Sequence, residues 1–62
     1  MNPLWKEFPD YDPHCLGWRM GGGEDYLASW RKYLRALSAE ELAAYMAKEP
    51  APEGWQDYYD SL

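Results

Sequence analysis

The sequence predicts an all-α protein, a small compact bundle of about three helices with an irregular N-terminal arm. The 62 residues include no Val, Ile or Thr, the β-branched residues on which strands draw most heavily. Residues 24–37 carry an unbroken helical stripe of apolar side chains, and residues 38–41 carry a helix-capping pattern. A chain of this length holds a single domain, residues 1–62.

Residues 1–23 are expected to form a wrapping arm with a short N-terminal helix. Asn2 and Pro3 suit the cap and the first position of that helix. The rest of the arm reads as irregular. Three apolar side chains are expected to anchor it by burial: Leu16, Trp18 and Met20.

Residues 24–37 are predicted to form the long central helix. Its stripe repeats at helical spacing without a miss, through Tyr26, Leu27, Trp30, Tyr33, Leu34 and Leu37. Acidic residues stand in the first turn, and the basic residues Arg31, Lys32 and Arg35 follow toward the end. This order suits the helix macrodipole, so the basic cluster is interpreted as structural.

Two further helices are expected after it. Ser38 and Glu41 match a capping box, which predicts a second helix over residues 39–48, antiparallel to the first and stopped by Pro50. After a proline-containing connector, Trp55, Tyr58, Tyr59 and Leu62 recur at helical spacing. They predict a short C-terminal helix over residues 53–61 that docks by its aromatic side chains.

Composition narrows the classes of function. With eleven Asp and Glu against six Lys and Arg, the formal net charge is −5, which makes direct binding of nucleic acid or anionic lipid unfavourable. No apolar stretch approaches the roughly 20 residues of a membrane helix, and no signal-peptide pattern is present. A single cysteine fits a reducing compartment, so a cytoplasmic protein is expected.

The chemistry-bearing residues fall short of a metal or catalytic site. Asp10, Asp12, His14 and Cys15 lie close in sequence, but a zinc site needs two separated ligand pairs and no second pair exists. The triple glycine at 21–23 lacks the residues of a phosphate-binding loop, and no nucleophile stands beside a base and an orienting group. The sequence therefore predicts a protein that is not an enzyme and needs no cofactor or metal.

The strongest functional signal is the distribution of acid. Residues 49–62 carry a charge of −4 with no basic residue. Glu53, Asp57 and Asp60 would line one face of the predicted C-terminal helix, at a spacing comparable to phosphates along a nucleic-acid strand. The candidate partner-binding residues are Glu49, Glu53, Asp57, Asp60, Asp10 and Asp12. A solvated helix face that keeps the protein soluble is the competing interpretation.

Two classes of function remain open. The first is a small acidic binding or inhibitor protein that docks on a basic, nucleic-acid-handling protein as a nucleic-acid mimic. In size and charge, though in no motif, the chain is similar to small phage-encoded inhibitors such as anti-CRISPR proteins. The alternative is a structural subunit or homo-oligomeric module in which surplus aromatic side chains form the interface.

Overall fold

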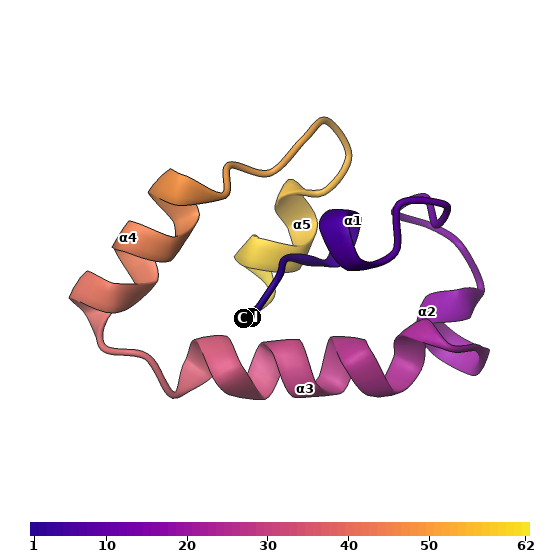
Figure 1. Cartoon of the computed structure of the whole chain (residues 1–62), viewed down its shortest axis with the longest axis horizontal. Helices are drawn as coiled ribbons and strands as arrows, with labels where there is room; N and C mark the ends of the chain where they lie inside the picture. Colours follow the sequence, from indigo (N-terminus) through magenta and orange to yellow (C-terminus); the bar gives the residue numbers. More distant parts are fainter.

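The computed structural model describes all 62 residues and consists of helices joined by turns (Figure 1). Helices account for 58% of the chain and there are no strands, which confirms the all-α prediction. Five helices are present rather than about three: α1 (Leu4–Glu7), α2 (Gly17–Met20), α3 (Gly23–Arg35), α4 (Ala39–Lys48) and α5 (Gln56–Asp60). Only α3 and α4 are longer than five residues.

Helix α3 is the longest helix and lies along the lower edge of the molecule in Figure 1. Leu27, Trp30 and Leu34 bury one side of it, as their spacing predicts. Tyr33 lies at the edge of the same stripe and is 40% exposed, so the stripe is narrower than expected. The helix begins at Gly23, where an added Cβ would lie 2.5 Å from Cε3 of the Trp18 ring. Glycine at this position lets α3 start directly against the buried indole of α2.

The arm contains a helix that the sequence did not predict. Helix α2 is a single turn, capped at Leu16 by backbone alone, and it buries Trp18 against α3. The expectation that Leu16 and Met20 anchor the arm is wrong, since they are 66% and 81% exposed. In so short a helix, the one aromatic ring takes up the available apolar surface of α3, and its neighbours along the chain point to solvent.

Helix α1 also begins differently from the prediction. Pro3, not Asn2, occupies the cap position, and no side chain caps the helix. The Asn2 side chain instead donates a hydrogen bond to Glu7 Oε1 at 3.3 Å. The short N-terminal helix is present, and it buries Leu4 in the core.

Helix α4 begins where the capping box predicts. Glu41 N donates to Ser38 Oγ at 3.1 Å, and Ser38 N donates to Glu41 Oε1 at 2.9 Å. The expected antiparallel packing is wrong, because α4 splays away from α3 after the turn (Figure 1). None of its residues is fully buried; Leu42, Tyr45 and Met46 are half-buried against the core.

Helix α5 is shorter than the predicted 53–61. Gly54 adopts a φ of 91°, a left-handed conformation that favours glycine, and the helix starts only at Gln56. Trp55 and Tyr59 are buried, so the aromatic side chains dock this end of the chain as predicted. In Figure 1, α5 and α1 occupy the opening between α3 and α4.

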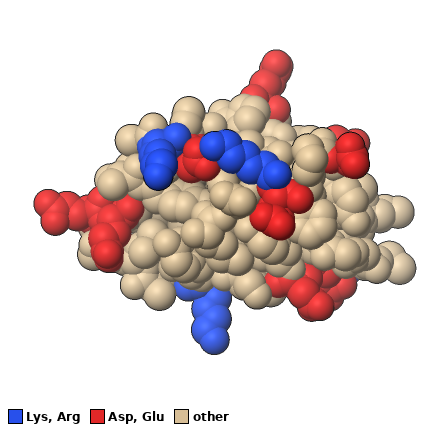
Figure 2. Space-filling model, in the orientation of Figure 1, with Lys and Arg blue, Asp and Glu red and all other residues tan.

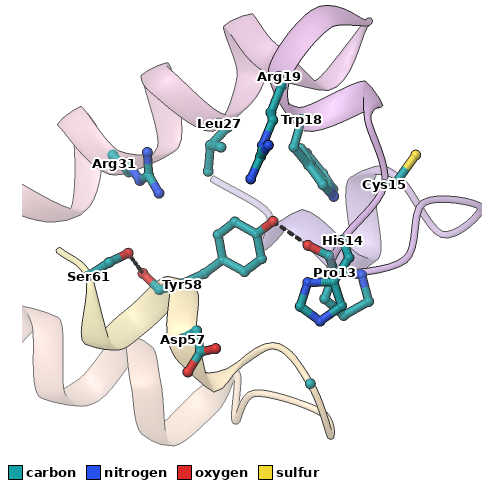
Figure 3. Close-up of a pocket in the computed structure, with 11 residues that line it drawn as sticks. Pro13, His14, Cys15, Trp18, Arg19, Leu27, Arg31, Asp57, Tyr58 and Ser61 are labelled. Carbon is teal, nitrogen blue, oxygen red and sulfur yellow. Dashed lines mark hydrogen bonds between the residues drawn. The ribbon is translucent and has the colours of Figure 1, made fainter.

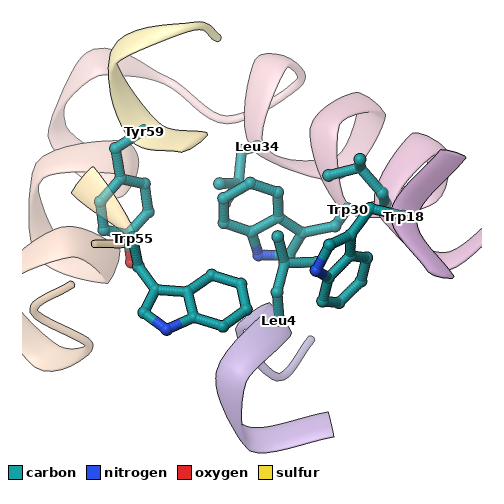
Figure 4. Close-up of a cluster of buried hydrophobic side chains, with 7 residues drawn as sticks. Leu4, Trp18, Trp30, Leu34, Trp55 and Tyr59 are labelled. Carbon is teal, nitrogen blue, oxygen red and sulfur yellow. The ribbon is translucent and has the colours of Figure 1, made fainter. Parts of the chain in front are cut away.

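The core is built mainly from aromatic rings (Figure 4). The Trp30 ring stacks on Tyr59 with centroids 5.7 Å apart, and Trp18 meets Trp55 edge to face at 5.8 Å. Seven buried hydrophobic residues make up this cluster: Leu4, Trp18, Leu27, Trp30, Leu34, Trp55 and Tyr59. The helices therefore meet through side chains from both ends of the sequence.

Candidate functional site

The acidic residues of the C-terminal segment do not share one helical face. Asp57 and Asp60 lie exposed on α5, whereas Glu53 lies in the turn before it. Because Gly54 separates Glu53 from the helix, the predicted face of three carboxylates at helical spacing is not formed. The Asp60 carboxylate accepts a hydrogen bond from the Gln56 amide at 3.1 Å.

Glu49 differs from the other candidate residues because its carboxylate forms an ion pair with a lysine of the same chain. Lys6 Nζ lies 2.7 Å from Glu49 Oε1, and the Glu49 side chain is only 12% exposed. This is the only ion pair in the protein. Its location, between the arm and the end of α4, indicates that Glu49 holds the chain together rather than facing a partner.

Asp10 and Asp12 lie on the arm and are exposed. Asp12 Oδ1 accepts a hydrogen bond from His14 N at 2.8 Å, and the Asp12 carbonyl accepts one from Trp18 Nε1 at 2.9 Å. These contacts make Asp12 a turn residue that also anchors the indole of α2. Nowhere do three or more His, Cys, Asp or Glu side chains come together as metal ligands.

The acidic surface is divided. On the face seen in Figure 2, separate acidic groups lie at the edge of the molecule, with uncharged surface between them. Other acidic side chains lie further in, next to basic side chains in the upper half of the view. A partner that recognises negative charge would therefore contact several separate acidic groups on this side of the molecule. It would not find one continuous acidic patch there.

A groove of about 440 Å³ opens between α3, α5 and the arm (Figure 3). Its apolar wall consists of Pro13, Trp18, Leu27 and the ring of Tyr58. Charged and polar side chains also line it: His14, Arg19, Arg31, Asp57 and Ser61. The remaining lining residues are Cys15 and Gly54. The Tyr58 hydroxyl donates to the Pro13 carbonyl at 2.6 Å, which fixes α5 against the arm.

Two guanidinium groups approach this groove from different helices. Arg19 comes from α2 and Arg31 from α3, and Figure 3 shows both reaching toward the Tyr58 side chain. Neither forms an ion pair, although Asp57 lines the same groove. Arg31 Nε is the one buried side-chain donor of the protein without a hydrogen-bond partner.

The titration of Tyr58 reflects the same surroundings. Burial raises the pKa of its hydroxyl above the ordinary value, while the charges of Arg31 and Arg19 act in the opposite direction. Both arginines line the same groove as this ring. Burial has the larger effect, as expected for a ring that forms the wall of the groove.

Sequence reasoning missed this groove and its arginines. From the sequence, Arg31 is interpreted as complementing the helix dipole, and no role is predicted for Arg19. The available signal was weak: Arg31 follows the buried Trp30 directly, and Arg19 follows the buried Trp18. Both arginines thus stand beside an anchored indole, but only the tertiary fold brings them to one opening.

Comparisons with protein-family models, with curated proteins and with solved structures found no match to this chain. None of the five helices is long and apolar enough to cross a bilayer. Two features of the surface are therefore candidates for function: the exposed carboxylates without an ion pair and the arginine-lined groove.

Proposed function

We propose that this chain is a small, non-enzymatic binding protein whose exposed carboxylates dock on a basic, nucleic-acid-handling protein of the cytoplasm. The observation that carries the proposal is the lack of internal cations beside the acid. Of eleven Asp and Glu side chains, only Glu49 forms an ion pair. The others have no cation of their own chain within ion-pair distance, although some accept hydrogen bonds: Glu7, Asp12, Glu41 and Asp60.

The C-terminal segment supplies the main contact in this proposal. Glu53, Asp57 and Asp60 are all exposed, and no basic residue follows Lys48. Asp10 and Asp12 of the arm add further exposed carboxylates. Glu49 is left out of the contact because Lys6 neutralises it.

Such a protein acts as an inhibitor by occupying the sites that phosphates of a nucleic acid would fill, in the manner of a nucleic-acid mimic. Attraction between oppositely charged surfaces speeds association and weakens with salt. The carboxylates need not form one continuous face, because basic grooves contact phosphates at separated points.

The alternative is a structural subunit or homo-oligomer held by exposed aromatic side chains. It has less support, because the four tryptophans are buried or half-buried and Tyr33 is the only aromatic residue among the exposed large hydrophobic ones. The remaining exposed apolar side chains, Met1, Leu16 and Met20, are aliphatic.

The test is capture of a partner from extract of the native host. We expect the wild-type chain to retain a basic protein at low salt and to release it when salt is raised or when duplex DNA or RNA is added. Reversal of the three C-terminal carboxylates (Glu53→Lys, Asp57→Lys, Asp60→Lys) should abolish capture while the helical circular dichroism spectrum is preserved.

A matched triple variant serves as the control. Glu24→Lys, Asp25→Lys and Glu40→Lys change the net charge equally at exposed positions elsewhere, and capture should persist. Capture that survives the C-terminal reversal, or that nucleic acid does not displace, would contradict the proposal. Loss of self-association on Tyr33→Ala, with no effect of salt, would favour the alternative.

A further inference from the structure

The groove between α3, α5 and the arm combines an excess of positive charge with an unfilled donor. Arg19 and Arg31 line it against one carboxylate, Asp57, in a protein whose net charge is −5. Ten other acidic side chains were available to neutralise these arginines, and none forms an ion pair with them. The positive charge of the groove is thus open to a ligand.

A second observation concerns the Nε–H group of Arg31, which is buried and has no hydrogen-bond acceptor within the chain. A buried donor without an acceptor destabilises the folded state, and such donors are rare in native proteins. Because Arg31 lines the groove, an anion that draws its guanidinium toward the opening would give this donor an acceptor. No acceptor of the chain itself satisfies the donor.

The shape of the groove indicates what kind of anion it accepts. Its volume of about 440 Å³ lies within the range of small-molecule sites, roughly 300–1,000 Å³. The ring of Tyr58, with Trp18 and Leu27, provides an apolar wall for a flat or hydrophobic group. A bare inorganic ion would leave this wall without contacts.

The charge on the ligand follows from the arrangement of the arginines. They come from two helices, so each guanidinium reaches the ligand from its own side. A phosphate monoester carries about two negative charges and three outer oxygens, enough to accept hydrogen bonds from both groups. A carboxylate has a single charge and two coplanar oxygens, which suits one guanidinium better than two.

We propose that this groove is a binding site for a small organic phosphate, with Arg19 and Arg31 holding the phosphate and the Tyr58 wall contacting the organic group. This site differs from the acidic docking surface in the sign of its charge, and the two share only Asp57. Asp57 lines the groove, where it repels a phosphate, and it also belongs to the proposed partner contact.

The experiment is an NMR titration of the full chain with phenyl phosphate, following the arginine Nε–H signals. We expect a saturable shift of the Arg31 signal, with inorganic phosphate binding more weakly and phenol leaving the arginine signals unchanged. Arg31→Gln and Arg19→Gln should each weaken binding about tenfold or more, because each removes charge-assisted hydrogen bonds.

Two further variants test whether binding depends on the location of the arginine and on the charge of the groove. Arg35→Gln removes the same charge from the same end of α3 at an exposed residue outside the groove, and binding should be nearly unchanged. Asp57→Asn should tighten binding about two- to fivefold by removing a like charge. Arg19 is exposed, so its variant remains informative if Arg31→Gln alters the fold.

Three results would contradict the proposed phosphate site. Absence of a saturable shift, or an Arg35→Gln variant as weak as Arg31→Gln, would overturn the site. Equal affinity for inorganic phosphate and phenyl phosphate would overturn its assignment to an organic phosphate. None of these results bears on the capture experiment above, since that experiment depends on carboxylates and not on the arginines.

Discussion

The Tyr59 hydroxyl donates a hydrogen bond of 2.6 Å to the backbone carbonyl of Glu49, the residue that ends α4. The carboxylate of the same Glu49 pairs with Lys6 of the arm. One residue thus joins three parts of the chain, because its main chain contacts α5 and its side chain contacts the segment around α1. This junction holds α4, which has no fully buried residue of its own.

Tyr59→Phe removes the hydroxyl and keeps the ring that stacks on Trp30. We expect the free energy of unfolding to fall by about 0.5–1.5 kcal/mol, the net contribution of one hydrogen bond. Tyr33→Phe is the control, since the Tyr33 hydroxyl makes no hydrogen bond within the chain and the ring is exposed. Equal effects of the two substitutions in urea unfolding would contradict the role given to the Tyr59–Glu49 contact.

The same hydroxyl predicts a limit to stability at high pH. Burial raises the pKa of Tyr59 from 10.0 to about 12, with smaller contributions from Tyr45 and Glu49. Since the pKa is higher in the folded state, this stabilisation is complete below pH 10.0 and is lost as the pH rises through about 12. In ultraviolet titration, the tyrosine that ionises last in the wild type should be absent from Tyr59→Phe.

The capping box gives a prediction for α4. Ser38→Ala removes the acceptor for Glu41 N and should lower the free energy of unfolding by about 0.5–2 kcal/mol. Ala39→Ser is a nearby exposed substitution that leaves the cap in place. A Ser38→Ala variant with wild-type stability in thermal or urea unfolding would show that the cap does not determine where α4 begins.

Glu41 adds a dependence on acid. Its hydrogen bonds with the backbone and side chain of Ser38 lower the pKa of its carboxyl below the ordinary 4.5. The stabilisation is therefore present above pH 4.5 and lost as the pH falls through the lower folded value. Glu41→Gln keeps an acceptor without the charge, so the advantage of the wild type over this variant should shrink below pH 4.5. A constant advantage of the wild type over Glu41→Gln across this pH range would contradict the role given to the Glu41 carboxylate.

Close packing at the start of α3 predicts a contrast between two neighbouring glycines. At Gly23 an added Cβ would lie 2.5 Å from the Trp18 ring, whereas at Gly22 its nearest neighbour is the Tyr11 hydroxyl at 3.4 Å. Gly23→Ala should therefore destabilise by about 1–3 kcal/mol through overpacking, and Gly22→Ala far less. Similar melting temperatures for the two variants would show that α2 can move away from α3 at little cost.

Sequence reasoning succeeded where the determinants are local. Ser38 and Glu41 fix the start of α4 through contacts within one turn, and Leu27, Trp30 and Leu34 mark the inner side of α3 by spacing alone. It failed where a long-range neighbour decides. Leu16 and Met20 are as apolar as Trp18, but only the contacts of the finished fold determine which of them is covered.

The candidate sites divide in the same way. The absence of basic residues after Lys48 is visible in the sequence, so the exposed carboxylates could be named in advance. The pairing of Glu49 with Lys6 spans 43 positions and could not be predicted. Nor could the meeting of Arg19, Arg31 and Tyr58, which depends on α5 docking beside the arm.

The contacts between the two ends of the chain have a consequence for biosynthesis. Trp5 packs on Trp55 and Tyr59, with ring centroids 5.7 Å apart in both pairs. At a translation rate of about 5–20 residues per second, the ring of Trp5 lacks these two partners, and the ring of Trp18 lacks Trp55, until residues 55–59 leave the ribosome. The nascent chain thus exposes an aromatic surface of the kind that holdase chaperones bind. A product truncated in the connector after α4 would keep this surface exposed and would stay bound to such chaperones.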